Sequence, residues 1–250
     1  MKIKISGIIV GVEYDCDFWE EEISKGYITP ESRFNSVLAK ATGPLDIEIN
    51  SFGGSVWAAA SMEAAVKAWR AANPKAPLTI TVTGIALSAA AGLVAALHDT
   101  ATIRAYSGAQ LMYHSCSSFT IGGPGAHQDA VTLLNNYNKT LVENLMAASS
   151  YPENEIKGWL EEGRAGWLTA KDAAAHGLIH EIIDAKAMPT PKPSQDDAKV
   201  MMQRGRLDLA ACFASPTMSL LDSIAQTAAQ GDDAQGEEGD QGDDAQGEEG

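Results

Sequence analysis

The chain has 250 residues, with 18 Lys and Arg against 33 Asp and Glu, which gives a formal net charge of −15. This length suits one ordinary domain with appendages or two small domains. Such an acidic chain lacks the clustered Lys and Arg that bind nucleic-acid phosphates, so nucleic acid is excluded as a partner. The three cysteines, Cys16, Cys116 and Cys212, are sparse and form no CxxC pair, which excludes a disulfide framework and a zinc site.

The N-terminus shows no signal-peptide pattern, and the longest apolar stretch, residues 84–97, is shorter than the roughly 20 residues that span a bilayer. We therefore expect a soluble cytoplasmic protein without a membrane partner. Ten of the acidic residues lie in residues 221–250 with no basic one, so residues 1–220 carry 23 acidic and 18 basic residues, or −5.

Composition divides the chain into four parts. Residues 1–186 alternate strand-like and helix-like patterns and form the expected folded domain. Residues 187–200 hold three prolines in a polar context and are interpreted as a linker. Residues 201–230 form a short C-terminal segment, and residues 231–250 repeat GDDAQGEEG twice. That repeat is too polar and glycine-rich to bury a core, so we expect a disordered acidic tail.

Within the domain the predicted elements alternate between strand and helix, which indicates parallel strands joined by crossover helices. The glycine at 177 is expected to end the last helix. In chain order we expect strand Leu45–Asn50, helix Ser55–Ala72, strand Leu78–Thr83, helix Ser88–Leu97, strands Ala101–Arg104 and Gln110–Tyr113, helix Gln128–Ser149, a helical turn at Trp159–Glu162, helix Thr169–His176 and strand Leu178–Ile183.

Three features along this pattern could carry chemistry. The turn Ser51–Gly54 (SFGG) lies between a strand and a helix, where its glycines leave backbone N–H groups able to bind an oxyanion. Taken alone, the two glycines favour a plain tight turn. Ser88 follows a strand and opens a helix of small residues, where a serine is also a common cap. Its flanking glycines do not match GxSxG. His114 ends a strand and could serve as the general base that a serine nucleophile needs.

The order of these three features is a Gly-Gly turn, a serine at a strand-to-helix junction and a histidine at a strand end. A chain with this order resembles the Clp protease proteolytic subunit family, which has the Clp/crotonase fold. The resemblance covers about residues 3–186, and its phage head maturation branch is the nearest because no Clp-type N-terminal extension precedes Ile3 and a further region follows the domain. The resemblance implies an α/β spiral of repeated β-β-α and βαβ units with a mostly parallel sheet, assembled as a ring. The matching stretches are INSFGGSV at 49–56, GIALSAAAGLVAAL at 84–97, LMYHS at 111–115 and WLTAKDAAAHGLIHEII at 167–183.

By position, the resemblance implies that Ser88 is the nucleophile and His114 the general base. The N–H groups of Gly54 and Ala89 would form the oxyanion hole, and Gly53 would shape the substrate-binding turn. The implied activity is a serine endopeptidase, acting in phage prohead or capsid maturation in the host cytoplasm. The implied partners are capsid or scaffold proteins as substrates, further copies of the chain, and an AAA+ ATPase as a candidate. No cofactor and no metal are expected.

The sequence departs from the family at the third member of the triad. The acid normally stands two residues before the aromatic residue matched by Trp167, and that position is Ala165. Three accounts stay open: Glu161 or Glu162 reaches His114; Asp172 does so, although its expected role is a solvent-facing charge in the first turn of a helix; or the enzyme works as a Ser–His dyad or is inactive.

Other functions and residues remain as alternatives. A crotonase-like enzyme would use the same two N–H groups to polarise an acyl-CoA thioester, and a non-catalytic assembly protein would keep only the fold. Cys116, two residues from His114, is a weaker nucleophile candidate than Ser88. Shared metal binding by His176 and His180 is not expected, because Gly177 lies between them. His98 and His127 are expected at loop or helix-start positions, and the five Trp residues are expected to pack in the core or at interfaces.

Overall fold

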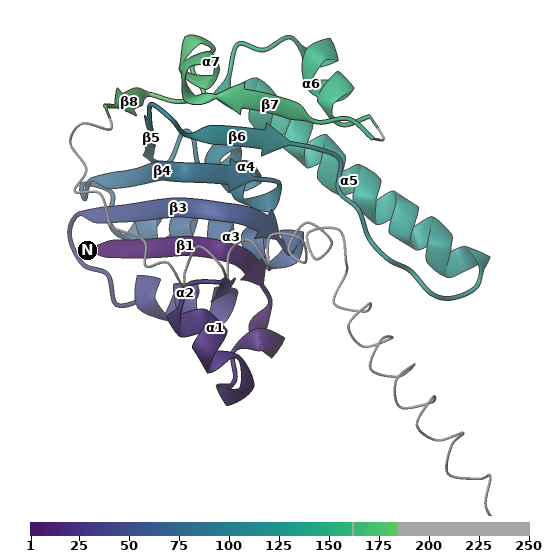
Figure 1. The fold of residues 1–250 in the computed structure, drawn as a ribbon, viewed down its shortest axis with the longest axis horizontal. Coiled ribbons are helices and arrows are strands. Elements are labelled where there is room, and N and C mark those ends of the chain that lie inside the picture. Colours follow the sequence, from purple (N-terminus) through teal and green to yellow (C-terminus); the bar gives the residue numbers. More distant parts are fainter. Residues whose placement is uncertain (162, 185–250) are drawn as a thin grey trace, which may run out of the picture.

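The structure is a computed structural model that describes residues 1–161 and 163–184. Eight strands form one sheet (Figure 1). The strands are β1 (Lys2–Val10), β2 (Ile28–Pro30), β3 (Leu45–Gly54), β4 (Leu78–Leu87), β5 (Thr102–Tyr106), β6 (Gln110–Tyr113), β7 (Gly166–Thr169) and β8 (Glu181–Ile183). The α-helices are α1 (Glu20–Ser24), α2 (Glu31–Leu38), α3 (Val56–Ala72), α4 (Ala89–Ala96), α5 (Pro124–Ala148), α6 (Glu153–Trp159) and α7 (Ala170–Ala175), and two short 3-10 helices are η1 (Val12–Tyr14) and η2 (Asp17–Trp19).

The sheet is mostly parallel, as the alternation of strands and helices predicted. Its main order is β2-β1-β3-β4-β5-β8, and β6 pairs with both β4 and β7. Every ladder is parallel except the antiparallel pair β6–β7. β4 is therefore flanked by β3 over its length and by β6 at its end, which places three strand ends together where the candidate residues lie.

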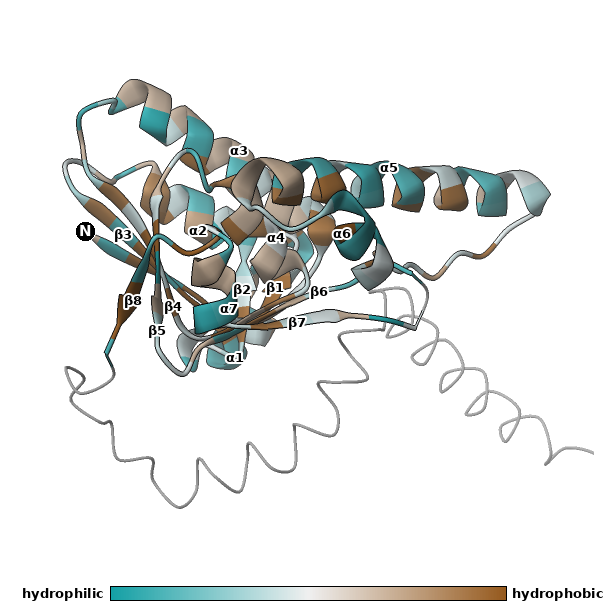
Figure 2. Ribbon diagram, turned by 90° about the horizontal axis from the view of Figure 1, so that it is seen from above, coloured by the Kyte–Doolittle hydropathy of each residue, from teal (hydrophilic) through white to brown (hydrophobic). Residues whose placement is uncertain are grey.

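Helices cover one face of the sheet and leave the other polar. Figure 2 shows α2, α3, α4 and α5 on the same side of the strands. The alternation of β3 turns Leu45, Ile47 and Ile49 into the core beneath them, each 1–2% exposed. The opposite face carries charged and hydroxyl side chains, including the Lys2–Glu48 ion pair (2.6 Å). This one-sided burial explains why the strands alternate instead of being apolar throughout.

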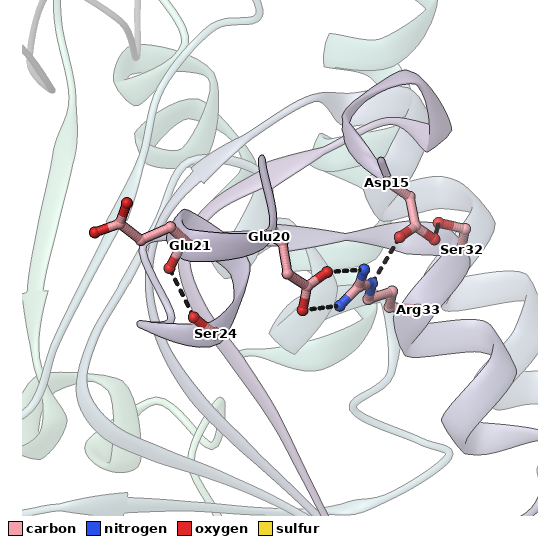
Figure 3. A network of polar contacts seen from close by, with 6 residues as sticks. All are labelled: Asp15, Glu20, Glu21, Ser24, Ser32 and Arg33. Carbon is pink, nitrogen blue, oxygen red and sulfur yellow. Dashed lines mark hydrogen bonds and ion pairs between the residues drawn. The ribbon is translucent and has the colours of Figure 1, made fainter. Parts of the chain in front are cut away.

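The first 44 residues contain elements that the sequence analysis did not predict: β1, β2, α1, α2 and the two 3-10 helices. Arg33 on α2 ties this region together (Figure 3). Its Nε donates to Asp15 Oδ1 (2.6 Å) and its Nη1 donates to Glu20 Oε1 (3.1 Å). The Ser32 hydroxyl also donates to Asp15, and these hydrogen bonds lower the pKa of the Asp15 carboxyl. The short segments η1, η2 and α1 were missed because they bury no residue and are held by polar contacts. β1, by contrast, alternates buried and exposed residues and could have been predicted from its sequence.

The predicted elements after residue 44 are present with shifted bounds. β4 and α5 are longer than expected, and α5 begins four residues earlier, at Pro124, which occupies the first turn after Gly123. The helical turn predicted at Trp159–Glu162 is wrong in place: the helix is α6, which ends at Trp159. The sequence analysis did not predict β7, although its residues alternate between buried and exposed. The segments predicted at 187–200, 201–230 and 231–250 lie outside the described residues.

Helix α5 projects beyond the sheet in both views (Figures 1 and 2). Its C-terminal half is anchored by Leu145 and Ala148, which are buried, whereas Val131 and Leu133 in its N-terminal half are 50% and 39% exposed. Among the described helices, none is both long and apolar enough to cross a membrane.

Candidate active site

Ser88 stands at the sharp turn from β4 into α4. Its backbone has φ 54° and ψ −125°, and among the described residues it is the only one other than glycine with a positive φ. Such a conformation stores about 1–3 kcal/mol of strain and is typical of functional turns. The sequence lacks GxSxG, but the backbone makes the same kind of strained strand-to-helix turn that presents a nucleophilic serine.

The alternative role of Ser88, capping α4, is not observed, because its side chain makes no capping hydrogen bond. Instead its Oγ lies 2.8 Å from Nε2 of His114. The pairing of β4 with β6 brings the two residues together: Leu87 is in register with Met112, and the Ser88 N–H donates to the Met112 carbonyl (2.8 Å). One parallel ladder thus brings together Ser88 and His114, which are 26 residues apart in the sequence. The expected proximity of the two side chains is present.

His114 is partly buried, and burial lowers the pKa of its imidazole from the ordinary value of 6.5. Loss of solvent disfavours the charged ring. The ring is therefore neutral at pH 7, which is the form that can accept a proton. With Nε2 directed at the hydroxyl, the arrangement can act as a general base toward Ser88.

The SFGG turn, which was expected as a separate element after the strand, is instead the last four residues of β3. It lies directly against Ser88. Gly53 and Gly54 have φ of +90° and +137°, so both adopt backbone conformations that favour glycine. A Cβ built on Gly53 would lie 2.4 Å from the Leu87 carbonyl oxygen and 2.9 Å from the Ala89 nitrogen. No larger residue fits there, which explains why a glycine stands at this position. The turn and the start of α4 thus form one continuous backbone surface beside the Ser88 side chain.

Ser51 is a supporting residue that the sequence analysis did not single out. It is fully buried, and its Oγ donates to the Gly7 carbonyl (2.7 Å) and accepts the Gly53 N–H (3.0 Å). It therefore fixes the turn from within the sheet. A signal existed, because Ser51 continues the inward-facing series of β3, where a hydroxyl must find internal partners.

The described candidates for the third triad residue are all exposed. Ala165 is exposed just before β7. Glu161 is also exposed, and its Oε2 lies 3.3 Å from Nε of Arg164. Asp172 forms a capping box with Thr169 at the start of α7, the solvent-facing role that was expected of it. Glu162 lies outside the described residues.

The remaining candidates lie apart from one another and in different surroundings. Burial raises the pKa of the Cys116 thiol, which disfavours the reactive thiolate. His176 stacks on Tyr151, with ring centroids 3.7 Å apart. His180 instead contacts His98 in a tilted arrangement, with centroids 4.3 Å apart, and accepts the Ile103 N–H through Nδ1. The two histidines of the 176/180 pair thus have separate partners. His127 lies in the first turns of α5, as expected of a helix-start residue.

The mostly parallel sheet thus brings a serine in a strained turn and a histidine together on an α/β fold, an arrangement suited to nucleophilic chemistry. The Clp protease family model matches residues 37–186, which is most of the described chain, and the chain belongs to the Clp protease family. Membership supports a serine-type peptidase, and Clp proteases form oligomeric rings that act on protein substrates. The predicted family resemblance is confirmed at this level.

Proposed function

We propose that the protein is a serine endopeptidase in which Ser88 is the nucleophile and His114 the general base. The observation that carries the proposal is the 2.8 Å contact between Ser88 Oγ and His114 Nε2 at a serine held in a strained turn. A partly buried, neutral imidazole at this distance is what a serine nucleophile requires. Family membership supports the same chemistry.

The reaction follows from this geometry. His114 takes the Ser88 proton as the oxygen attacks the peptide carbonyl, and the imidazolium then donates that proton to the leaving amine. Water, deprotonated by His114, next attacks the acyl-enzyme, and the imidazolium returns the proton to the Ser88 oxygen as the ester bond breaks and the acid product leaves. The oxyanion of each tetrahedral intermediate is bound by the N–H groups of Gly54 and Ala89, with Gly53 shaping the surface that receives the substrate. Ala89 opens α4, so its N–H lies at the positive end of the helix dipole.

The cellular role we propose is maturation of a phage prohead, with capsid or scaffold proteins as substrates in the host cytoplasm. The support is the resemblance of the four ordered stretches to the Clp protease family, of which the head maturation proteases are the branch that the sequence analysis favoured. A ring of identical subunits is also proposed, and the half-exposed apolar side chains on the projecting end of α5 support a self-association surface. An AAA+ ATPase is the candidate partner for delivering substrates.

The domain proposal is that residues 1–186 form the peptidase, followed by the linker, the short segment and the acidic tail. The last described strand, β8, pairs with β5 through Ile183. A chain shortened after residue 186 keeps this ladder. We expect it to retain Ser88 reactivity, while any loss of binding to basic partner surfaces would report a role of the tail.

A fluorophosphonate probe tests the proposal directly. We expect stoichiometric labelling of the folded full-length chain at Ser88, none in Ser88→Ala, and slow labelling in His114→Gln. Casein and capsid-derived peptides should be cleaved by the wild-type chain and not by Ser88→Ala. Folded wild-type protein that stays unlabelled would refute the assignment of Ser88.

A non-catalytic assembly protein is the second candidate, and Ala165 is the observation that favours it. The two candidates differ in one combined measurement of mass in solution and peptide turnover. A ring that neither cleaves peptides nor reacts with the probe would support the assembly protein.

A further inference from the structure

Asn138 on α5 binds the two residues that follow His114. Its side-chain Oδ1 accepts the backbone N–H of Cys116 (2.9 Å), and its Nδ2 donates to the hydroxyl of Ser115 (3.2 Å). Both polar ends of one amide are therefore used on the same short segment. An amide that satisfies a donor and an acceptor together fixes orientation as well as distance.

This segment has no regular secondary structure of its own. β6 ends at Tyr113, and residues 114–121 form neither helix nor strand before α5 begins at Pro124. On its N-terminal side His114 is fixed by the β6 ladder, where Tyr113 pairs with Gly166. On its C-terminal side the contacts of Asn138 are the fixed point. His114 thus lies between β6 and a segment that Asn138 holds by two hydrogen bonds. These two hydrogen bonds are called the Asn138 clamp.

We propose that Asn138 is a positioning residue, which keeps the imidazole of His114 in line with Ser88 by holding the Ser115–Cys116 backbone to α5. The inference rests on the proposed function, since it assigns Asn138 a role in the same reaction. Asn138 does not touch the reacting atoms; it acts through the backbone of the histidine segment. Because α5 is anchored at its far end by Leu145 and Ala148, the clamp ties His114 to the core.

The magnitude follows from the sensitivity of proton transfer to geometry. A displacement of about 1 Å at a catalytic group can lower the rate about 100-fold. Loss of the two Asn138 hydrogen bonds releases the segment after His114, but the His114 imidazole itself stays in the chain. We therefore expect a loss between about 10-fold and 100-fold in kcat, with KM changed less than about threefold, because the substrate-binding turn is on a different strand.

Three variants test the proposal. Asn138→Leu has a similar volume and removes both hydrogen bonds. Asn138→Asp keeps an acceptor for the Cys116 N–H and can accept from the Ser115 hydroxyl, so it should restore most of the rate. Asn136→Leu makes the same chemical change at an exposed position of the same helix and serves as the matched control.

The decisive readout is the time course of fluorophosphonate labelling on the full-length chain. A positioning role predicts a rate constant about 10-fold or more lower in Asn138→Leu with full final labelling, and near wild-type rates in the other two variants. A role limited to stability would instead reduce the final amount labelled and leave the rate constant of the folded fraction unchanged. That result, or a wild-type rate in Asn138→Leu, would overturn the proposal.

A second measurement separates this proposal from the proposed function. NMR of the histidine ring reports the pKa and environment of His114 without any turnover. If the wild-type chain is folded but unreactive, the peptidase assignment fails, and the clamp is then judged on the ring signals alone. Unchanged His114 signals in Asn138→Leu would refute the clamp even in that case, whereas a shift absent from Asn136→Leu would support it.

Discussion

Tyr113 pairs with Gly166 at the end of the antiparallel β6–β7 ladder, so the next residues of the two strands are His114 and Ala165. Residues that follow a ladder pair in this way stay close to one another. By this register, the position that supplies the acid in the family comes one step beyond the last ladder pair, on the strand next to that of His114. In this chain that position is Ala165, which holds only a methyl group. The chain therefore differs from the family in the side chain at this position, whereas the strand pairing that leads to it is present.

The first prediction is that Ala165→Asp increases peptidase activity. A carboxylate beside His114 would orient the ring and stabilise the imidazolium formed during the reaction. Ala165 is exposed, so a larger side chain fits at this position. We expect kcat to rise about 10-fold or more, within the roughly 10⁴-fold contributed by a triad acid elsewhere.

Ala165→Asn is the matched control, because it adds the same bulk without charge. An opposite charge favours the protonated ring, so Ala165→Asp should also raise the pKa of His114 while Ala165→Asn should not. Peptide turnover as a function of pH measures both effects. Equal rates in the two variants would mean that the added carboxylate does not reach the histidine.

The second prediction concerns pH. Burial lowers the pKa of His114, and only the neutral ring accepts the Ser88 proton. Activity should therefore persist below pH 6.5, the ordinary histidine value, and decline as the pH falls through the lowered pKa. The free energy of unfolding changes in the same direction. His114 has a lower pKa in the folded chain than in the unfolded chain, so its protonation as the pH falls favours unfolding. The pH dependence of kcat/KM checks this, and an acidic limb centred above 6.5 would contradict it.

The third prediction is that Ser51→Ala slows acylation by distorting the SFGG turn. The variant leaves the Gly7 carbonyl and the Gly53 N–H without their buried partner, which costs about 1–3 kcal/mol of stability. We expect kcat to fall about 10-fold, less than the 10²–10³ that follows loss of an oxyanion donor itself. Peptide turnover and probe-labelling rates measure the effect.

Thr29→Val is the control for Ser51→Ala. The Thr29 hydroxyl likewise donates to a carbonyl and accepts an N–H, both of Ser6, but on β2. The two variants should lose comparable stability in denaturant titrations, and only Ser51→Ala should slow the labelling of Ser88. A similar loss of rate in both would show that general stability, and not the turn, controls the chemistry.

Much of the site was predictable because its residues follow strands. Ser88 and His114 each come directly after a strand of the expected parallel sheet, and the ends of neighbouring parallel strands meet. Ser51 could have been found from the inward series of β3. Asn138 could not, because it is one of several polar residues on a long helix and its function depends on a loop that has no periodic pattern.

The N-terminal third shows the same limit at the level of the fold. Arg33 joins Asp15 and Glu20 across 18 and 13 residues of sequence, and nothing in the local pattern marks those residues as partners. Apolar periodicity identifies elements that bury a face. It does not identify short segments that charged hydrogen bonds hold in place, which is why η1, η2 and α1 were absent from the prediction.

The last prediction asks which acid, if any, supports His114. Glu161 is exposed and paired with Arg164, so Glu161→Gln should leave kcat within about twofold of wild type. Asp172 is committed to the capping box, and Asp172→Asn should reduce stability more than rate. Glu162→Gln tests the third acid that the sequence analysis named. If this carboxylate supports His114, the variant should lower kcat at least about 10-fold and move the acidic limb of the pH profile downward, because loss of a nearby negative charge lowers the histidine pKa. Peptide turnover across pH for the three variants distinguishes these roles. Wild-type rates and pH profiles in all three would identify a Ser–His dyad that works without a third residue.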